Sequence, residues 1–122
     1  MTITRIGITE PSGGIPIISK AVVHAGIVYL CGVTPDASGD IEEQTDQVLA
    51  RVERLLAAAG SDKSKLLTAQ VWLSDMRLFE RHNARWNAWV DPSNPPVRAC
   101  VEARLWQPGM LVEVMVTSSA HD

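Results

Sequence analysis

Two stretches decide the fold: Pro95-Pro96-Val97-Arg98-Ala99-Cys100-Val101-Glu102-Ala103-Arg104-Leu105 and Leu111-Val112-Glu113-Val114-Met115-Val116. In both, successive side chains alternate in character, which is the pattern of a β-strand with two different faces. The residues between them include Pro108-Gly109, a pair that is typical of a turn. The sequence therefore predicts that the two strands form a hairpin.

The hairpin would place two functional charges on one face of the sheet. The apolar members of the first stretch alternate with its polar members, so one predicted face holds Val97, Ala99, Val101, Ala103 and Leu105. The opposite face then carries Arg98, Cys100, Glu102 and Arg104, and in the second stretch it carries Glu113 and Met115. A guanidinium and a carboxylate side by side can bind an acidic small molecule and move a proton. We therefore expect Arg98 and Glu113 to lie together, although an ion pair of Glu113 with an arginine would be the purely structural alternative.

Further strands and two helices precede this pair. The strands are predicted at residues 2–6, 15–24, 27–33 and 66–73. The first helix begins after Asp40, which forms a capping-box pattern with Glu43, and it ends at Gly60. The second begins at Ser74 or Asp75 and ends before the prolines of residues 92–96.

This order, β-β-β-α-β-α-β-β, predicts one α+β domain over residues 1–122. Two helices would cover one face of a mixed six-stranded sheet in a two-layer sandwich. The predicted helix-facing side chains are Leu67, Ala69, Val71, Leu73, Val97, Ala99, Val101, Ala103, Val112, Val114 and Val116. The other face carries Trp72 and Met115 and is too apolar for a solvated surface, so we expect another subunit to cover it.

Composition narrows the class of partner. The chain has 14 acidic and 11 basic side chains, a net charge of −3, which argues against a nucleic-acid partner. No apolar run reaches the roughly 18 residues of a membrane span, and residues 1–5 lack a signal-peptide layout. Neither the two cysteines nor the three histidines show metal-ligand spacing, so we expect no metal, no cofactor and a cytoplasmic protein with reduced thiols.

A set of motifs then identifies a family. The motifs are Ser19-Lys20-Ala21-Val22, Leu30-Cys31-Gly32, Gln44-Thr45, Ala59-Gly60-Ser61, Trp72-Leu73-Ser74-Asp75-Met76, Asn83 with Trp86, Pro95-Pro96-Val97-Arg98-Ala99 and Leu111-Val112-Glu113-Val114. In this order they resemble the RidA/YjgF family over nearly the whole chain. The most specific parts are the Pro-x-Arg-x-x-Val strand and the later Val-Glu-Val strand.

The resemblance implies a chorismate-mutase-like fold and a homotrimer with ligand clefts between its subunits. It also implies hydrolysis of reactive enamines and imines, such as 2-aminoacrylate, to 2-oxo acids and ammonia. Arg98 would hold the substrate carboxylate, and Glu113 would orient or activate the attacking water. The further substrate-binding positions that the resemblance implies are Cys100, Cys31, Gly32, Ile18 and Asn83.

Two of these positions depart from the family pattern. Ile18 stands where many deaminases of the family have a tyrosine, and Cys31 replaces the usual serine or threonine. Both changes favour a more apolar ligand than 2-aminoacrylate. A non-catalytic trimeric binding protein for small carboxylates therefore remains an alternative. An endoribonuclease activity is disfavoured by the acidic charge and by the lack of a basic, aromatic groove.

Overall fold

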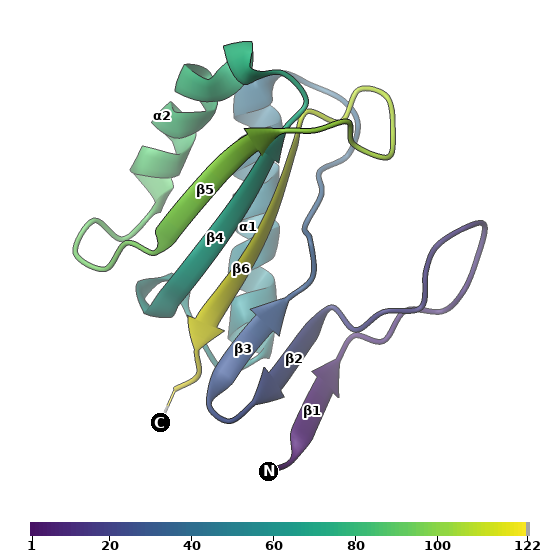
Figure 1. The fold of residues 1–122 in the computed structure, drawn as a ribbon, viewed down its shortest axis with the longest axis vertical. Coiled ribbons are helices and arrows are strands. Elements are labelled where there is room, and N and C mark those ends of the chain that lie inside the picture. The colour runs from purple at the N-terminus through teal and green to yellow at the C-terminus, as the bar shows by residue number, and fades with distance from the viewer. Residues whose placement is uncertain (122) are drawn as a thin grey trace.

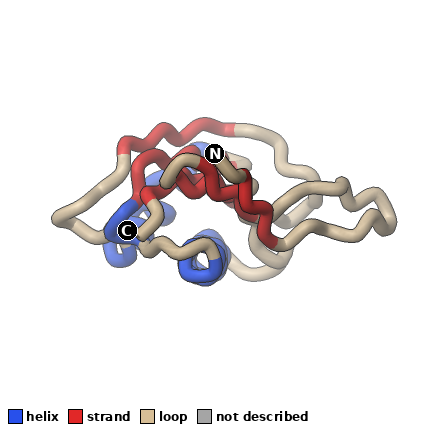
Figure 2. The backbone as a smooth tube through the Cα atoms, turned by 90° about the horizontal axis from the view of Figure 1, so that it is seen from below, coloured by secondary structure: helices blue, strands red, loops and turns tan. Residues whose placement is uncertain are grey.

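The computed structural model describes residues 1–121, which form a mixed six-stranded sheet with two helices on one side (Figures 1 and 2). The elements are β1 (Ile3–Ile6), β2 (Ala21–His24), β3 (Ile27–Leu30), α1 (Ile41–Ala58), β4 (Leu66–Leu73), α2 (Phe79–Trp89), β5 (Val97–Glu102) and β6 (Val112–Ser119). The strand order is β1-β2-β3-β6-β4-β5, and only β4 and β5 run parallel. The predicted α+β class and the order of the elements are confirmed.

A carboxylate caps the start of α1, and another caps the 3₁₀ turn that precedes α2. The Asp40 side chain accepts a hydrogen bond from the Glu43 amide at 2.9 Å and opens α1. Asp75 caps a 3₁₀ turn, Met76–Leu78, which runs directly into α2. The apolar stripe of α1 packs on the buried side chains of β6, and α2 lies beside α1 over the β4–β5 end of the sheet (Figure 1). This end of the sheet holds the arginine discussed below.

The predicted hairpin between the last two strands is wrong, because β4 lies between β5 and β6. β4, α2 and β5 form a β-α-β unit, and its helical crossover brings β5 alongside β4 in the parallel direction. The turn-like segment after β5 then spans the end of β4 instead of closing a tight hairpin.

The predicted faces of β5 are also inverted. Arg98 pairs with Ala69 and Cys100 pairs with Val71, and both β4 partners are buried on the helix side. Residues opposite each other in a sheet share a face, so Arg98 and Cys100 point towards the helices. β5 is an edge strand that α2 only partly covers, and a polar environment can therefore exist on its helix side.

Three other strand predictions differ in detail. A register shift between Leu66 and Thr68 buries Leu66 and leaves Leu67 exposed, so Leu67 is not a core residue. The predicted strand over residues 15–24 shortens to β2, because residues 7–20 form a projecting loop (Figure 1). The third strand ends at Leu30, and Val33 then pairs separately with β6.

The side of the sheet away from the helices is open and apolar in a single chain. Its large exposed side chains are Tyr29, Leu67, Val97, Val101 and Met115. An apolar surface of this kind is typical of an interface. Within residues 1–121, no helix has the length and apolar character that crossing a membrane requires.

Gln44 ties the loop before β6 to α1, and its loss should destabilise the fold. Its buried side chain donates to the Gly109 carbonyl at 2.8 Å and accepts from the Leu111 amide at 2.7 Å. Gln44→Leu leaves both backbone groups without this partner, so we expect a loss of about 2–4 kcal/mol in the free energy of unfolding. Urea denaturation measures the loss. Gln47→Leu, which removes only exposed hydrogen bonds to Asp36, is the matched control, and equal losses in both variants would contradict the assignment.

Candidate functional site

The guanidinium of Arg98 is held from α2 and has no carboxylate partner among residues 1–121. Its Nη2 donates to Asn83 Oδ1 at 2.7 Å, and its Nη1 lies 3.4 Å from His82 Nε2. The guanidinium carbon is 5.0 Å from the centre of the Trp86 ring. Burial lowers the pKa of Arg98 from its usual value, but the group stays cationic at neutral pH. Arg98, Asn83, His82 and Cys100 are called the arginine half-site below.

His82 lies beneath this guanidinium in the core. It is fully buried, and its Nδ1 is 3.0 Å from the hydroxyl of Thr45, which is fully buried as well. Burial, and secondarily the charge of Arg98, lowers the pKa of His82 to about 4. The ring is therefore neutral near pH 7.

Glu113 lies on the opposite face of the sheet from Arg98. It pairs with Trp72 of β4, whose side chain points away from the helices. Its carboxylate lies directly over Gly32, where an added Cβ would be only 2.1 Å from Glu113 Oε2. Gly32 has a negative φ, so a larger residue here would meet the Glu113 side chain and not a backbone restriction. Burial raises the pKa of Glu113, which favours proton exchange closer to neutral pH.

A bulge brings the Gly32 backbone under this carboxylate. Three residues lie between Tyr29 and Val33, whereas only two lie between their β6 partners Thr117 and Val114. Cys31 lies in the bulge, and its amide donates to the Lys20 carbonyl at 2.9 Å. Glu113, Gly32 and Cys31 are called the glutamate half-site below.

The two half-sites are separate in one chain, so the expectation that Arg98 and Glu113 share a face is wrong. Ala69 of β4 pairs with Arg98 of β5 on one side and with Val116 of β6 on the other. Val116 lies three residues beyond Glu113 along β6. Three residues cover about 10 Å along a strand, and the two strand spacings from β5 to β6 cover about 10 Å more. With the sheet between them as well, the two side chains of one chain cannot meet on one small ligand.

The remaining predicted position, Ile18, is not part of either half-site. It lies in the projecting loop with 41% of its surface exposed, and its amide donates to Thr9 Oγ1 at 2.9 Å. Two residues later, the Lys20 carbonyl accepts from the Cys31 amide. The structure therefore groups Asn83 and Cys100 with Arg98, and it places Gly32 and Cys31 with Glu113.

The two cysteines are free and are not activated as nucleophiles. Burial raises the thiol pKa of both Cys31 and Cys100, so that both stay protonated near pH 7. Lys20 beside Cys31 and Arg98 beside Cys100 oppose this shift without reversing it. Among the described residues, no three histidine, cysteine or acidic side chains cluster closely enough to hold a metal.

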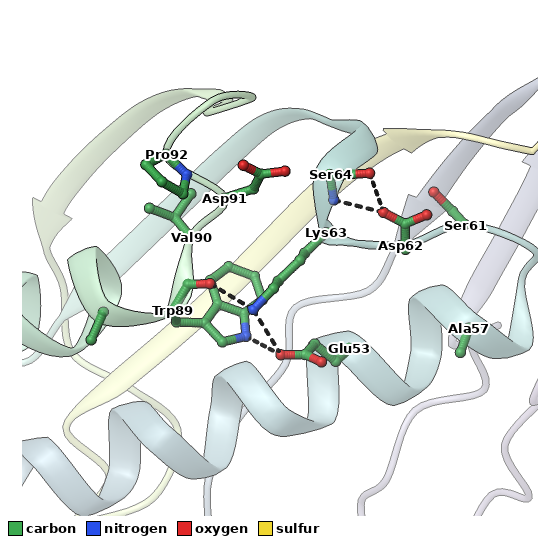
Figure 3. A pocket seen from close by; sticks show the side chains of 11 residues that line it. Glu53, Ala57, Ser61, Asp62, Lys63, Ser64, Trp89, Val90, Asp91 and Pro92 are labelled. Atoms are coloured by element: carbon green, nitrogen blue, oxygen red, sulfur yellow. Dashed lines mark hydrogen bonds and ion pairs between the residues drawn. The ribbon is translucent and has the colours of Figure 1, made fainter.

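A surface hollow of about 600 Å³ lies away from both half-sites, where both helices end (Figure 3). Lys63 crosses it, donating to the Trp89 carbonyl at 2.8 Å and lying 3.7 Å from Glu53. The Trp89 indole also donates to Glu53. The ammonium thus satisfies a carbonyl at the negative end of α2, and this cluster is accounted for as a helix cap.

Sequence reasoning missed His82 and Thr45 as neighbours of the site. The sequence shows only that none of the three histidines has metal-ligand spacing. The available signal was the position of His82, four residues before the buried Trp86 and next to Asn83. A polar side chain at that position must find buried partners, but the sequence does not say which ones.

Comparisons with known proteins agree over almost the whole chain. The family described as endoribonuclease L-PSP matches residues 15–120. A RutC family protein of Haemophilus ducreyi is 39% identical over 98% of this chain and 97% of its own length. The RutC family protein YoaB of Escherichia coli is 36% identical over 83% and 89%. The crystal structure of a YjgF-family protein from Neisseria meningitidis superposes with a TM-score of 0.92 at 40% identity, covering 100% of this chain and 98% of its own.

Proposed function

Because the chain belongs to the RidA/YjgF family, we propose that it hydrolyses small enamine or imine acids to 2-oxo acids and ammonia. One observation carries the proposal: Arg98 is fixed by Asn83 and has no carboxylate partner within residues 1–121. A guanidinium in this state can donate two parallel hydrogen bonds to a substrate carboxylate.

The proposed site needs two copies of the chain. Arg98 and Glu113 of one copy lie on opposite faces, so a cleft that uses both must take each from a different subunit. The exposed apolar face around Val97, Val101 and Met115 supports such an assembly. We propose the homotrimer that the family resemblance implies, with the arginine half-site of one subunit facing the glutamate half-site of its neighbour.

The chemistry then divides between the half-sites. Arg98 binds the carboxylate of the imino acid, in which C2 is double-bonded to the nitrogen. Glu113 accepts a proton from water as the water oxygen bonds to C2, and this proton is returned to the nitrogen. The hydroxyl group of the resulting carbinolamine then loses its proton to the nitrogen, and as the C=O bond forms the C–N bond breaks, giving the 2-oxo acid and ammonia. An enamine substrate first takes a proton at C3 and loses one from its nitrogen to become the imine.

Cys31 of the glutamate half-site and Ile18 of the projecting loop favour a substrate with an alkyl chain. Ile18 and Cys31 offer no hydroxyl, and burial keeps the Cys31 thiol neutral. A short apolar chain on C3 is better accommodated here than by a polar wall. We therefore propose that 2-iminobutanoate is preferred over 2-iminopropanoate.

The test is direct measurement of turnover. A lyase that depends on pyridoxal phosphate generates the imino acids from serine or threonine, and the release of the 2-oxo acid is followed with and without this protein. The proposal requires faster release with the wild type than with Arg98→Ala. Thermal shifts on adding pyruvate or 2-oxobutanoate, without any acceleration, would instead favour the alternative of a carboxylate-binding protein.

Gly32→Ala should impair catalysis through Glu113 alone. The new Cβ would stand 2.1 Å from Glu113 Oε2 and must displace the carboxylate. We expect kcat to fall about 10²-fold, the lower range for losing a positioned general base. Steady-state kinetics of Gly32→Ala, Glu113→Gln and the double variant test this. Further loss in the double variant, beyond the loss caused by Glu113→Gln, would show that Gly32 acts in another way.

A further inference from the structure

Three polar side chains from three different elements form a chain of contacts inside the core. Thr45 comes from α1, His82 from α2 and Arg98 from β5. The hydroxyl of Thr45 is 3.0 Å from His82 Nδ1, and Arg98 Nη1 is 3.4 Å from His82 Nε2. Thr45 and His82 are both fully buried, so their polar atoms depend on one another and on Arg98 for partners.

The donors and acceptors determine the protonation of the ring. A guanidinium only donates hydrogen bonds, so His82 Nε2 must be the acceptor and carry no proton. The single proton of the neutral ring then lies on Nδ1, and it is donated to the hydroxyl oxygen of Thr45. Burial and the neighbouring guanidinium both disfavour a second proton on the ring, which agrees with a pKa of about 4 for His82.

These contacts hold both terminal nitrogens of the guanidinium. Asn83 Oδ1 accepts from Nη2 at 2.7 Å, and His82 Nε2 accepts from Nη1. A guanidinium has five N–H groups in one plane. Two of them are used here, and three remain for a ligand. Because two neighbouring side chains of α2 take part, the plane of the guanidinium is fixed relative to the helix.

We propose that His82 is a positioning residue for Arg98, holding the guanidinium plane through Nε2 while Thr45 holds the ring through Nδ1. This proposal rests on the proposed role of Arg98 as the anchor of the substrate carboxylate. His82 itself does not touch substrate. Its contribution is to orient the N–H donors of Arg98 before the substrate binds, so that they are already placed for the carboxylate.

Three variants test the proposal. His82→Leu removes both ring contacts, and His82→Gln keeps an acceptor within reach of Arg98. Thr45→Val leaves His82 Nδ1 without its hydrogen-bond partner. We expect His82→Leu to raise KM about tenfold with less than a threefold change in kcat, because carboxylate binding is shared by the ground and transition states. His82→Gln should restore KM to within about threefold of the wild type, and Thr45→Val should fall between the two. His24→Gln, a histidine of β2 outside both half-sites, is the matched control and should behave as the wild type.

Two readouts separate failure of this proposal from failure of the proposed function. Pyruvate serves as a carboxylate probe that needs no turnover, and its dissociation constant should follow the same order as KM. If the wild type lacks deaminase activity but His82→Leu still weakens pyruvate binding, the positioning role stands without the enzyme. If the wild type turns over and His82→Leu changes neither KM nor pyruvate affinity, the positioning role is overturned and the enzyme stands.

A measurement on the unliganded protein tests the same proposal independently of catalysis. Nitrogen-15 NMR of the imidazole rings reports which ring nitrogen carries the proton. The proposal requires His82 to be neutral at pH 7 with its proton on Nδ1, and it requires the Nε2 resonance to move in Arg98→Ala. A proton on Nε2, or an Nε2 resonance that does not respond to Arg98→Ala, would overturn the proposal whatever the variants show.

Discussion

Lysine in place of Arg98 is expected to lower kcat/KM about 10²-fold, and alanine about 10³-fold or more. Charge-assisted hydrogen bonds contribute roughly 1.5–3 kcal/mol each, and the guanidinium is placed to donate two of them to a carboxylate. Lysine keeps the charge but loses the planar fork, and it also loses the paired contacts with Asn83 and His82. Release of the 2-oxo acid from enzymatically generated imino acids measures the effect.

The neighbouring Arg104 provides the matched control. It is exposed, follows β5 closely in the sequence and lies outside both half-sites. Arg104→Ala removes the same charge and should leave kcat/KM within about twofold of the wild type. Equal losses for Arg104→Ala and Arg98→Ala would show that general charge matters, and that Arg98 is not a specific anchor.

The helices could be predicted from sequence because their signals are local. Asp40 and Glu43 are close enough in the chain to form a cap without any tertiary partner, and the structure contains that hydrogen bond. The buried face of β6 was predictable for a similar reason, since Val112, Val114 and Val116 alternate without interruption and all are buried.

The strand partner of β5, and the face of β5 that meets the helices, could not be predicted in the same way. Alternation shows that a strand has two faces, but it does not say which face meets the helices. In β5 the small apolar side chains Val97 and Val101 are exposed on the open face, and Arg98 points towards α2. The choice is made by α2, whose His82 and Asn83 supply polar partners that only the folded chain brings within reach.

The orientation of β5 also decides where the two half-sites lie, and their separation could not be predicted from sequence either. A hairpin would have put Arg98 and Glu113 side by side in one chain. Because β4 lies between β5 and β6 and the two side chains point to opposite faces, they can act on one ligand only across an interface between subunits. The sequence pattern predicts the two residues as a pair, and the topology allows them to share one site only if different subunits supply them.

Glu113→Gln is expected to lower kcat about 10²–10³-fold while substrate still binds, because the amide cannot accept the proton from water. Burial raises the pKa of Glu113 above the usual value of 4.5. A carboxylate base is lost as the pH falls through its pKa. In the wild type, kcat/KM should therefore decline on the acid side at a pH above 4.5, and this decline should be absent in Glu113→Gln. A decline of the same shape in Glu113→Gln would assign the base to another group.

Mixed oligomers of two inactive variants then test whether each cleft is shared between subunits. Arg98→Ala and Glu113→Gln are each expected to be nearly inactive when pure. Denatured together and refolded in equal amounts, they should recover about a quarter of the wild-type activity. A shared cleft is intact when one side supplies Arg98 and the other side supplies Glu113, each with a chance of about one half.

The reverse mixture completes the test, because a site within one chain predicts different values. Wild type refolded with an equal amount of the Arg98→Ala/Glu113→Gln double variant should have about a quarter of the activity of the same total amount of wild-type protein if the cleft is shared, but about half of it if each chain carries its own site. A site within one chain would also give no recovery when the two single variants are mixed. Because the two mixtures respond in opposite directions, a general loss of refolding yield cannot imitate the shared cleft. The expected pair of values follows from the opposed faces of Arg98 and Glu113 in the sheet.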